Sequence, residues 1–402
     1  MTVITAVLFY LLGLSGSEYC NYKGNNAGEK TATLYKKQLN SKNSFPEVLV
    51  NEAGQYTAEG LNVTVRDKLV RLNKFYALAE RKVMYRVKFS ADAKAVFRSS
   101  EGDFSAIVDV PAQRISIATS PASEKTVPFL QANREYLIEI FHIYQKALLR
   151  LTDVQTGETA DVAAVNDGPG GVGQGALQTG FGVGMQWDYY CFALTGGSSM
   201  LVSSIGVYAL KKKVKLLIYG DSITQPEGYF PTKDFPQACT QLVISELGGN
   251  AISSGRGGAR IDMVLDYIKN ELPFIRAKYV MVTIGTNGGN TEAKLTELVD
   301  YIKSQGATPI LNNIPANESG TQLTENLLIE QVRQKTSVTG CRFELPTSIN
   351  GDGKEVDKST MYWEDYSGSY GWQVYHHPNE KGGKKMFERT LLDVPEIYID
   401  SK

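Results

Sequence analysis

Histidine is scarce in this sequence, and neither sign of charge is in excess. Only 3 histidines occur in 402 residues, so histidine chemistry is confined to His142, His376 and His377. The 42 Lys and Arg residues nearly balance the 43 Asp and Glu residues, which gives a formal net charge of −1. Such a balance does not suit nucleic acid or anionic membrane lipid as the main partner. The length allows two domains, each with its own core.

Cysteine is also rare, and its spacing excludes the common metal and redox motifs. The chain has no C-x-x-C pair and no H-E-x-x-H, so neither a metal nor another cofactor is expected. An acidic run at 350–357 lacks the ligand set of an EF-hand loop. Either Cys20 pairs with Cys191 or all four cysteines are free thiols. The four are Cys20, Cys191, Cys239 and Cys341.

Long apolar runs are missing apart from a short one at the start. Residues 1–14 are mostly apolar and are followed by Ser-Gly-Ser, as in a secretory signal. The run is too short for a comfortable transmembrane span, and the usual early lysine or arginine is absent. We expect a signal peptide at 1–19 and a secreted or periplasmic protein without an integral membrane segment. A buried first strand is the alternative.

Residues 20–211 have the pattern of short β-strands. Val83–Phe89 alternates apolar and polar side chains with period two, as in a half-buried strand. Similar runs follow at 104–110, 114–118, 136–144, 148–153, 187–194 and 200–208. Many short strands without a helical stretch predict an antiparallel β-sandwich. Trp187, Tyr189 and Tyr190 could form a sugar-binding platform, but core packing is favoured because aromatic residues are enriched in strands.

The pattern changes after the basic connector at 210–213, and we place the domain boundary between 211 and 212. From 212 to 402, strand-like runs alternate with amphipathic helices. The predicted strands are 214–220, 250–254, 279–285, 309–315 and 341–345. The predicted helices are 235–247, 261–272, 292–304, 323–335 and 380–392. This alternation gives right-handed crossovers and a three-layer fold around a parallel sheet.

The first strand of this second half delivers a serine. It is apolar and β-branched and ends in Gly220-Asp-Ser222. In open parallel α/β sheets, ligands and catalytic groups gather at the carboxyl ends of the strands. A serine there becomes a nucleophile if a base, a group that orients the base and donors for an oxyanion are present. The neighbouring Asp221 is expected to hold the loop through backbone hydrogen bonds.

Four short blocks at successive strand or loop ends resemble those of the SGNH (GDSL-type) hydrolase family. They are Gly220-Asp-Ser222, Ser254-Gly255, Gly285-Thr-Asn287 and His377-Pro-Asn379, and the resemblance covers about residues 214–395. It implies a flavodoxin-like domain in which Ser222 is the nucleophile and His377 the catalytic base. It also implies an oxyanion hole built from the N–H groups of Ser222 and Gly255 and the side-chain amide of Asn287. The alternatives are a helix N-cap for Ser222 and a turn residue for Asn287.

The run after the second of two adjacent histidines matches the family's passage into its last helix. This selects His377 over His376, and His142 is expected to be structural. The first half resembles, in strand pattern alone, the concanavalin-like and laminin-G-like jelly rolls that accompany carbohydrate enzymes. Arg256 and Arg260 follow the oxyanion glycine and either meet the substrate or brace the loop.

One position departs from the family pattern. The family usually has an aspartate three residues before the histidine, whereas this chain has Val374. Because a hydrocarbon cannot accept the imidazole proton, a main-chain carbonyl or another carboxylate must do so. Glu364 and Asp365 are the nearest carboxylates. Without one, the chain could be an inactive relative that binds carbohydrate.

Together these features predict a metal-independent serine esterase that acts through an acyl-enzyme. The expected substrate is a short-chain acyl ester, acetyl above all, on a small molecule or an oligosaccharide. A lipase or thioesterase with the same catalytic residues is the alternative. It would need a long apolar groove, whereas the loops at this edge of the sheet are polar and glycine-rich.

Overall fold

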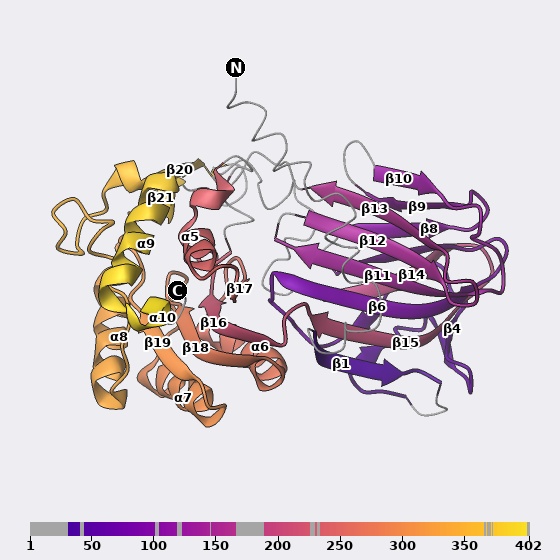
Figure 1. Ribbon diagram of the computed structural model, residues 1–402, viewed down its shortest axis with the longest axis horizontal. Coiled ribbons are helices and arrows are strands. Elements are labelled where there is room, and N and C mark those ends of the chain that lie inside the picture. The colour runs from indigo at the N-terminus through magenta and orange to yellow at the C-terminus, as the bar shows by residue number, and fades with distance from the viewer. Residues whose placement is uncertain are drawn as a thin grey trace, which may run out of the picture.

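The computed structural model describes residues 31–40, 44–100, 104–118, 123–144, 146–165, 189–225, 230, 234–365, 367, 371 and 373–399. Strands fill the first half of this part of the chain, and strands alternate with helices in the second half (Figure 1). The expected signal peptide, Cys20 and Trp187 lie outside the described residues. Within the described ranges, none of the helices combines the length and apolar character that crossing a bilayer demands.

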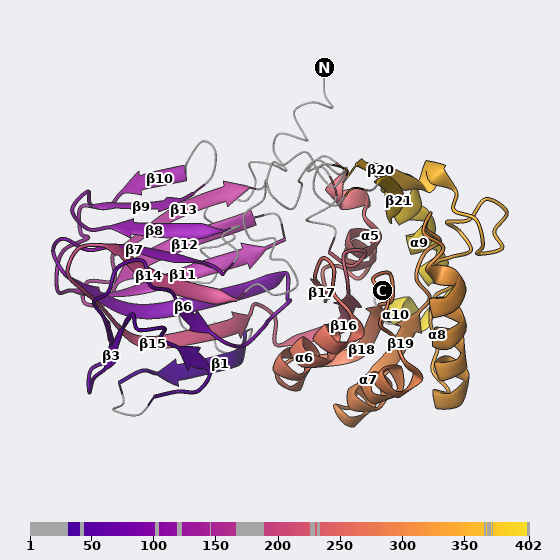
Figure 2. The same cartoon turned by 180° about the vertical axis from the view of Figure 1, so that it is seen from behind.

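The first half forms two antiparallel sheets. One has 8 strands: β1 (Ala32–Gln38), β3 (Gly54–Tyr56), β4 (Leu61–Val63), β6 (Glu80–Phe89), β11 (Glu135–Ile143), β12 (Lys146–Asp153), β13 (Thr159–Val165) and β15 (Met200–Ala209). The other has 7 strands: β2 (Val48–Leu49), β5 (Val70–Leu72), β7 (Lys94–Ser99), β8 (Ser105–Asp109), β9 (Arg114–Ile117), β10 (Ser123–Thr126) and β14 (Tyr190–Gly196). The order is β13-β12-β11-β6-β15-β4-β3 in the first, with β1 on β15, and β10-β9-β8-β7-β14-β5-β2 in the second. Figures 1 and 2 show them from opposite sides.

The two sheets pack face to face and are called the β-sandwich below. Burial alternates along β6, as the period-two pattern predicts. Its Tyr85 ring lies 4.8 Å from the Phe97 ring of β7 and 5.6 Å from the Phe192 ring of β14. Tyr189 and Tyr190 pack against the same core, as favoured from the sequence. The predicted antiparallel sheets are therefore confirmed, and the narrower assignment to a jelly roll stays a prediction.

The second half forms a parallel sheet. Its strands are β16 (Lys213–Gly220), β17 (Ala251–Gly255), β18 (Arg276–Thr283) and β19 (Thr308–Asn312), in the order β17-β16-β18-β19. The helices are α5 (Cys239–Glu246), α6 (Ile261–Glu271), α7 (Glu292–Ser304), α8 (Gln322–Thr336), α9 (Glu380–Asp393) and α10 (Glu396–Ile399). The described residues of this half also form the 3₁₀ turns η2 (Phe235–Gln237), η3 (Leu272–Phe274) and η4 (Lys358–Thr360). A two-stranded hairpin, β20 (Met361–Asp365) and β21 (Gln373–Pro378), precedes α9.

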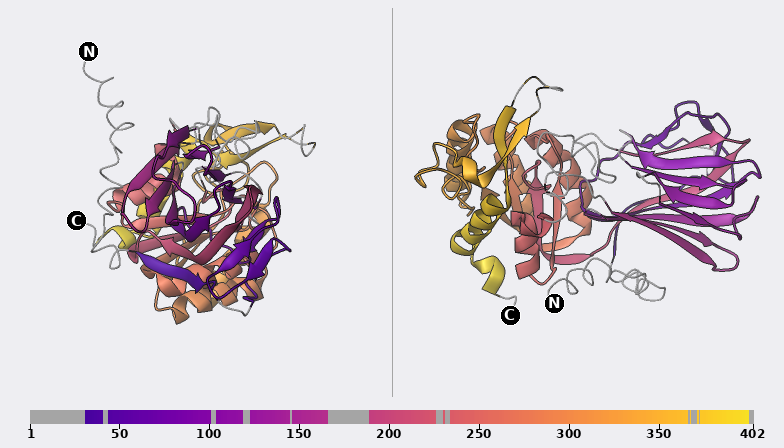
Figure 3. Two further views of the ribbon diagram at one scale, coloured as in Figure 1. Left: turned by 90° about the vertical axis from the view of Figure 1, so that its right-hand side faces the viewer. Right: turned by 90° about the horizontal axis from the view of Figure 1, so that it is seen from above.

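Helices cover both faces of this sheet. Side chains on one face, such as Leu217 and Val280, pack with α6, α7 and α8. Those on the other face, such as Leu216 and Met281, pack with α5, α9 and α10. Figure 3 shows this half beside the β-sandwich. The predicted parallel sheet with helices is confirmed, whereas its flavodoxin-like identity stays a prediction.

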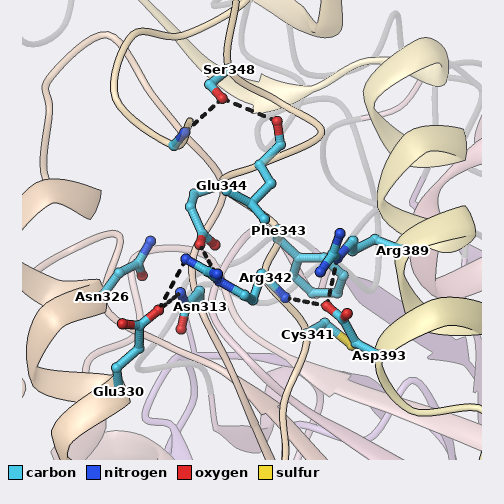
Figure 4. A network of polar contacts seen from close by, with 12 residues as sticks. Asn313, Asn326, Glu330, Cys341, Arg342, Phe343, Glu344, Ser348, Arg389 and Asp393 are labelled. Carbon is cyan, nitrogen blue, oxygen red and sulfur yellow. Dashed lines mark hydrogen bonds and ion pairs between the residues drawn. The ribbon is translucent and has the colours of Figure 1, made fainter. Parts of the chain in front are cut away.

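The predicted fifth strand at 341–345 does not form, so that prediction was wrong. The chain runs beside β19 and the residue after it, but its pairing is limited to isolated bridges of Thr339 with Ile310 and of Arg342 with Asn313. The N–H of Cys341 donates to Asn312 Oδ1 (2.9 Å), and the N–H of Arg342 donates to Asp393 Oδ2 (2.8 Å; Figure 4). Side-chain acceptors thus take the donors that a continuing strand ladder would use.

Charged side chains fix this segment between two helices. Figure 4 shows Arg342 between Glu330 of α8 and Glu344, at N–O distances of 3.5 and 3.2 Å. Arg389 of α9 donates to Asp393 (2.6 Å). The charges satisfy one another, which indicates a structural role for the network.

Candidate active site

The ends of three parallel strands meet at one edge of the sheet. Gly220 of β16 pairs in register with Gly255 of β17 and with Thr283 of β18. Ser222 follows two residues after Gly220, and Asn287 follows four residues after Thr283. In the chain β16 is followed by β17 and then by β18, and these two strands lie on opposite sides of β16. In open α/β sheets such a reversal of strand order marks the ligand-binding crevice.

A tight turn holds Ser222 at this edge. The N–H of Gln225 donates to the Ser222 carbonyl (3.1 Å), and the Ser222 residue is 4% exposed. Gly255 approaches the turn so closely that a Cβ at this position would lie 2.8 Å from the Asp221 carbonyl oxygen. Glycine is therefore required at 255 for close packing of the two loops.

Asp221 directly precedes Ser222 and supports the turn. Its Oδ1 accepts the N–H of Ile223 (3.0 Å), and its side chain is fully buried. Burial raises the pKa of Asp221 to about 6, while hydrogen bonds from Ile223 and Thr286 act in the opposite direction. These contacts agree with the predicted loop-holding role.

His377 and Glu364 form a buried pair on the β20–β21 hairpin. Nδ1 of His377 lies 2.5 Å from Oε1 of Glu364, and the two residues are 6% and 0% exposed. Glu364 pairs across the hairpin with Val374, the position at which the SGNH pattern expects an aspartate. The other candidate, Asp365, instead accepts the N–H of Ser367 (2.9 Å).

The neutral form of His377 is the form that can act as a base. Burial lowers the pKa of the His377 imidazole below its ordinary value, which favours the neutral ring. With its Nδ1 proton donated to Glu364, a neutral imidazole presents Nε2 as an acceptor. The carboxylate thus sets the tautomer that proton abstraction requires.

Ser222 and His377 line one small cavity. The rest of its lining is mainly apolar and comes from the loop after β16, α5, the end of β21 and α9: Ile223, Phe230, Ala238, Cys239, Pro378 and Met386. Burial raises the pKa of the Cys239 thiol to about 12, so the thiol is neutral and serves as lining. Cys239 and Cys341 are free thiols, and the proposed pairing of Cys20 with Cys191 stays untested.

Asn287 lies in a turn, and its side chain is also held in place. The N–H of Gly288 closes the turn on the Gly285 carbonyl (2.8 Å). The Asn287 amide donates to the Ala259 carbonyl (3.0 Å). Because an amide nitrogen carries two protons, the second remains available for a substrate oxygen.

The remaining candidate residues either make buried structural contacts or lie at the surface. Arg256 is 2% exposed and binds main-chain carbonyls, so it braces the loop, whereas Arg260 is exposed at the start of α6. His142 is buried and lies edge-on to Phe104 (4.7 Å), in agreement with a structural role. His376 lines a separate hollow beside the hairpin.

Sequence reasoning did not find the apolar lining or the hairpin that carries the histidine. The lining residues come from four separate elements and share no motif. The hairpin strands β20 and β21 are short, and Glu364 was identified only by its nearness in sequence to His377.

Comparisons with known proteins find distant similarity. No protein-family model matches the chain, and no curated protein matches it. Similar solved structures include a GDSL-like lipase from Bacteroides thetaiotaomicron, with 16% identity over 45% of this chain and 86% of that chain and a TM-score of 0.32. LAE5, an alpha/beta hydrolase enzyme from the metagenome of Lake Arreo, Spain, shares 15% identity over 45% and 94%, with a TM-score of 0.35. Arcelin-5, a lectin-like defence protein from Phaseolus vulgaris, shares 11% identity over 44% and 97%, with a TM-score of 0.33.

Proposed function

We propose that this chain is a serine ester hydrolase of the SGNH type. The observation that carries the proposal is that Ser222 and His377 line one cavity while His377 is bound to the buried Glu364 (2.5 Å). A nucleophile, a base and a group that orients the base are the minimum set for acyl transfer through a serine. The contact also speaks against the inactive alternative, which depended on the hydrocarbon at Val374.

The reaction runs through an acyl-enzyme. Oγ of Ser222 attacks the ester carbonyl carbon while Nε2 of His377 takes the hydroxyl proton. The oxyanion accepts hydrogen bonds from the N–H of Ser222 and from the Asn287 amide. The N–H of Gly255, the third donor that the sequence suggested, instead faces the outer edge of β17, away from β16. As the tetrahedral intermediate collapses, the C–O bond to the alcohol breaks and His377 protonates the leaving oxygen. Water, deprotonated by the same imidazole, then releases the carboxylic acid and restores Ser222.

We propose a short acyl group, acetyl above all. The cavity beside Ser222 is small and closed by apolar side chains such as Cys239 and Met386. Such a lining suits a methyl group and leaves little space for a long chain, which speaks against the lipase alternative. The proposed leaving group is a carbohydrate hydroxyl, on the basis of the β-sandwich half and the SGNH resemblance. Division of the chain at 211/212 and export through residues 1–19 remain proposals from the sequence.

Ester hydrolysis by wild type and Ser222→Ala tests this function. We expect wild type to cleave p-nitrophenyl acetate faster than the octanoate and to release acetate from an acetylated oligosaccharide. Ser222→Ala should lose about 10³-fold or more in kcat. Ser245→Ala, at an exposed serine of α5, is the matched control and should behave as wild type. A fluorophosphonate should add mass to wild type but not to Ser222→Ala.

Activity that persists in Ser222→Ala would remove the proposed nucleophile. A folded wild type without activity on any of these esters would instead favour the carbohydrate-binding alternative. Preference for the octanoate would restore the lipase alternative.

A further inference from the structure

A segment of the β-sandwich lies along the edge of the parallel sheet. Residues 75–79, between β5 and β6, are all buried, and none is more than 3% exposed. They lie against β17, which is on the side of the sheet that faces the β-sandwich (Figure 1). Leu78 forms an antiparallel bridge with Ser254, and the N–H of Ala79 donates to the Ser253 carbonyl (2.9 Å). The segment thus covers the outer edge of β17.

A buried carboxylate joins the segment to the same strand. Glu271, at the end of α6, is fully buried. Its Oε1 accepts the N–H groups of Ala77 (2.5 Å) and Leu78 (3.1 Å). Its Oε2 accepts the Ser254 hydroxyl (2.7 Å). A buried carboxylate is tolerated when several donors satisfy it, so these three bonds fix the segment against β17.

A buried arginine continues the connection to the candidate active site. Arg256 donates from Nη1 to the Gly255 carbonyl (2.9 Å) and from Nη2 to the Tyr76 carbonyl (3.3 Å). It is among the largest fully buried side chains of the described residues. One guanidinium therefore ties the glycine beside the nucleophile turn to the backbone of the β-sandwich.

We propose that segment 75–79 of the β-sandwich positions the Ser222 turn through Arg256, which is a positioning residue, because Gly255 packs directly on that turn. This inference rests on the proposed function, in which Ser222 is the nucleophile. A displacement of about 1 Å can cost about 10²-fold in rate, so the position of the turn that carries the nucleophile matters. Since β17 is an edge strand, its outer side depends on the β-sandwich for partners. The two halves therefore form one catalytic unit.

Arg256→Met in the full chain tests the proposal. Methionine keeps much of the buried volume but donates to neither carbonyl. We expect kcat for p-nitrophenyl acetate to fall about 10- to 100-fold while KM stays within about 3-fold. The matched control is Asn270→Ala, which removes another bond to the segment, from the Asn270 amide to the Phe75 carbonyl (3.1 Å), without touching Gly255. It should lower Tm and leave kcat unchanged.

The split between kcat and stability decides the outcome. A folded Arg256→Met variant with wild-type kcat would overturn the inference, as would an equal loss of kcat in Asn270→Ala. If Arg256→Met does not fold, Arg256→Lys decides, since lysine keeps the charge but cannot span both carbonyls. A drop of about 10-fold in its kcat supports the positioning role, and wild-type kcat overturns it. Activity that survives Ser222→Ala would show that the proposed function itself is wrong, and this inference with it.

Discussion

The two halves of the chain bury their side chains in different ways. In β6 of the β-sandwich, burial alternates along the strand, because one face packs on the core and the other faces outward. In β16 of the parallel sheet, every residue from 214 to 220 is buried, because helices cover both faces. A strand such as β16 can therefore bring residues to solvent or to a ligand only at its ends.

This difference explains where buried polar side chains are found in the two halves. At the carboxyl ends of the parallel strands, buried polar side chains such as Asp221 and Asn312 hold loops and backbone in place. In the β-sandwich the core is built largely from aromatic and aliphatic contacts, such as Tyr85 on Phe97. We therefore expect substitutions at the carboxyl ends of the parallel strands to change kcat. Substitutions in the core of the β-sandwich should instead change the free energy of unfolding.

After Ser222→Ala, the largest effect is expected from Glu364→Gln. The amide keeps the size of the side chain but removes the negative charge that sets the His377 tautomer and stabilises its protonated form. We expect kcat for p-nitrophenyl acetate to fall about 10²- to 10⁴-fold with little change in Tm. Asp365→Asn is the matched control, because Asp365 contacts Ser367 and should leave kcat unchanged. Equal losses in the two variants would contradict the assignment of Glu364.

The opposite pattern is expected from Phe97→Ala in the β-sandwich. Phe97 is fully buried between the sheets, so its truncation should lower the free energy of unfolding by about 3–5 kcal/mol. The kcat of the folded protein should stay at the wild-type value, because the cavity lies in the sandwich core. Urea unfolding and initial rates on the same sample measure both. A fall in kcat as large as the Glu364→Gln effect would erase the contrast between the two halves.

Much of the second half could be predicted from the sequence because its signals are local. An apolar run followed by glycine and a polar residue identifies the end of a parallel strand, and this placed Ser222, Gly255 and Asn287 at one edge. Helix periodicity was as informative, since the prediction of 292–304 matches α7. The false strand at 341–345 failed because its backbone donors are taken by side chains 29 and 51 residues away in the chain.

Two features of the site have no local signal at all. The choice of Glu364 over Asp365 depends on the register of the β20–β21 hairpin, in which a slip of one residue turns a side chain to the other face. The contact of segment 75–79 with β17 joins residues almost 180 positions apart. Only the folded chain brings the β-sandwich to Gly255 and the Ser222 turn.

The smallest expected effect is a pH dependence at the junction of the halves. Burial raises the pKa of Glu271 to about 6 from its ordinary value of 4.5, while bonds from Ser254, Ala77 and Leu78 and the charge of Arg256 act in the opposite direction. The folded protein therefore binds this proton more tightly than the unfolded chain, and stability falls as pH rises from 4.5 to 6. The full loss, from well below pH 4.5 to well above pH 6, amounts to about 2 kcal/mol. Glu271→Gln cannot titrate and keeps an acceptor for the two N–H groups of the segment. Its free energy of unfolding relative to wild type should increase by about 1.5 kcal/mol between pH 4.5 and 6.5. Urea unfolding of both proteins across this pH range measures the difference in their free energies of unfolding. A difference that does not change with pH would contradict the raised pKa. It would show that Glu271 is ionised throughout, because its three hydrogen-bond donors lower the pKa more than burial raises it.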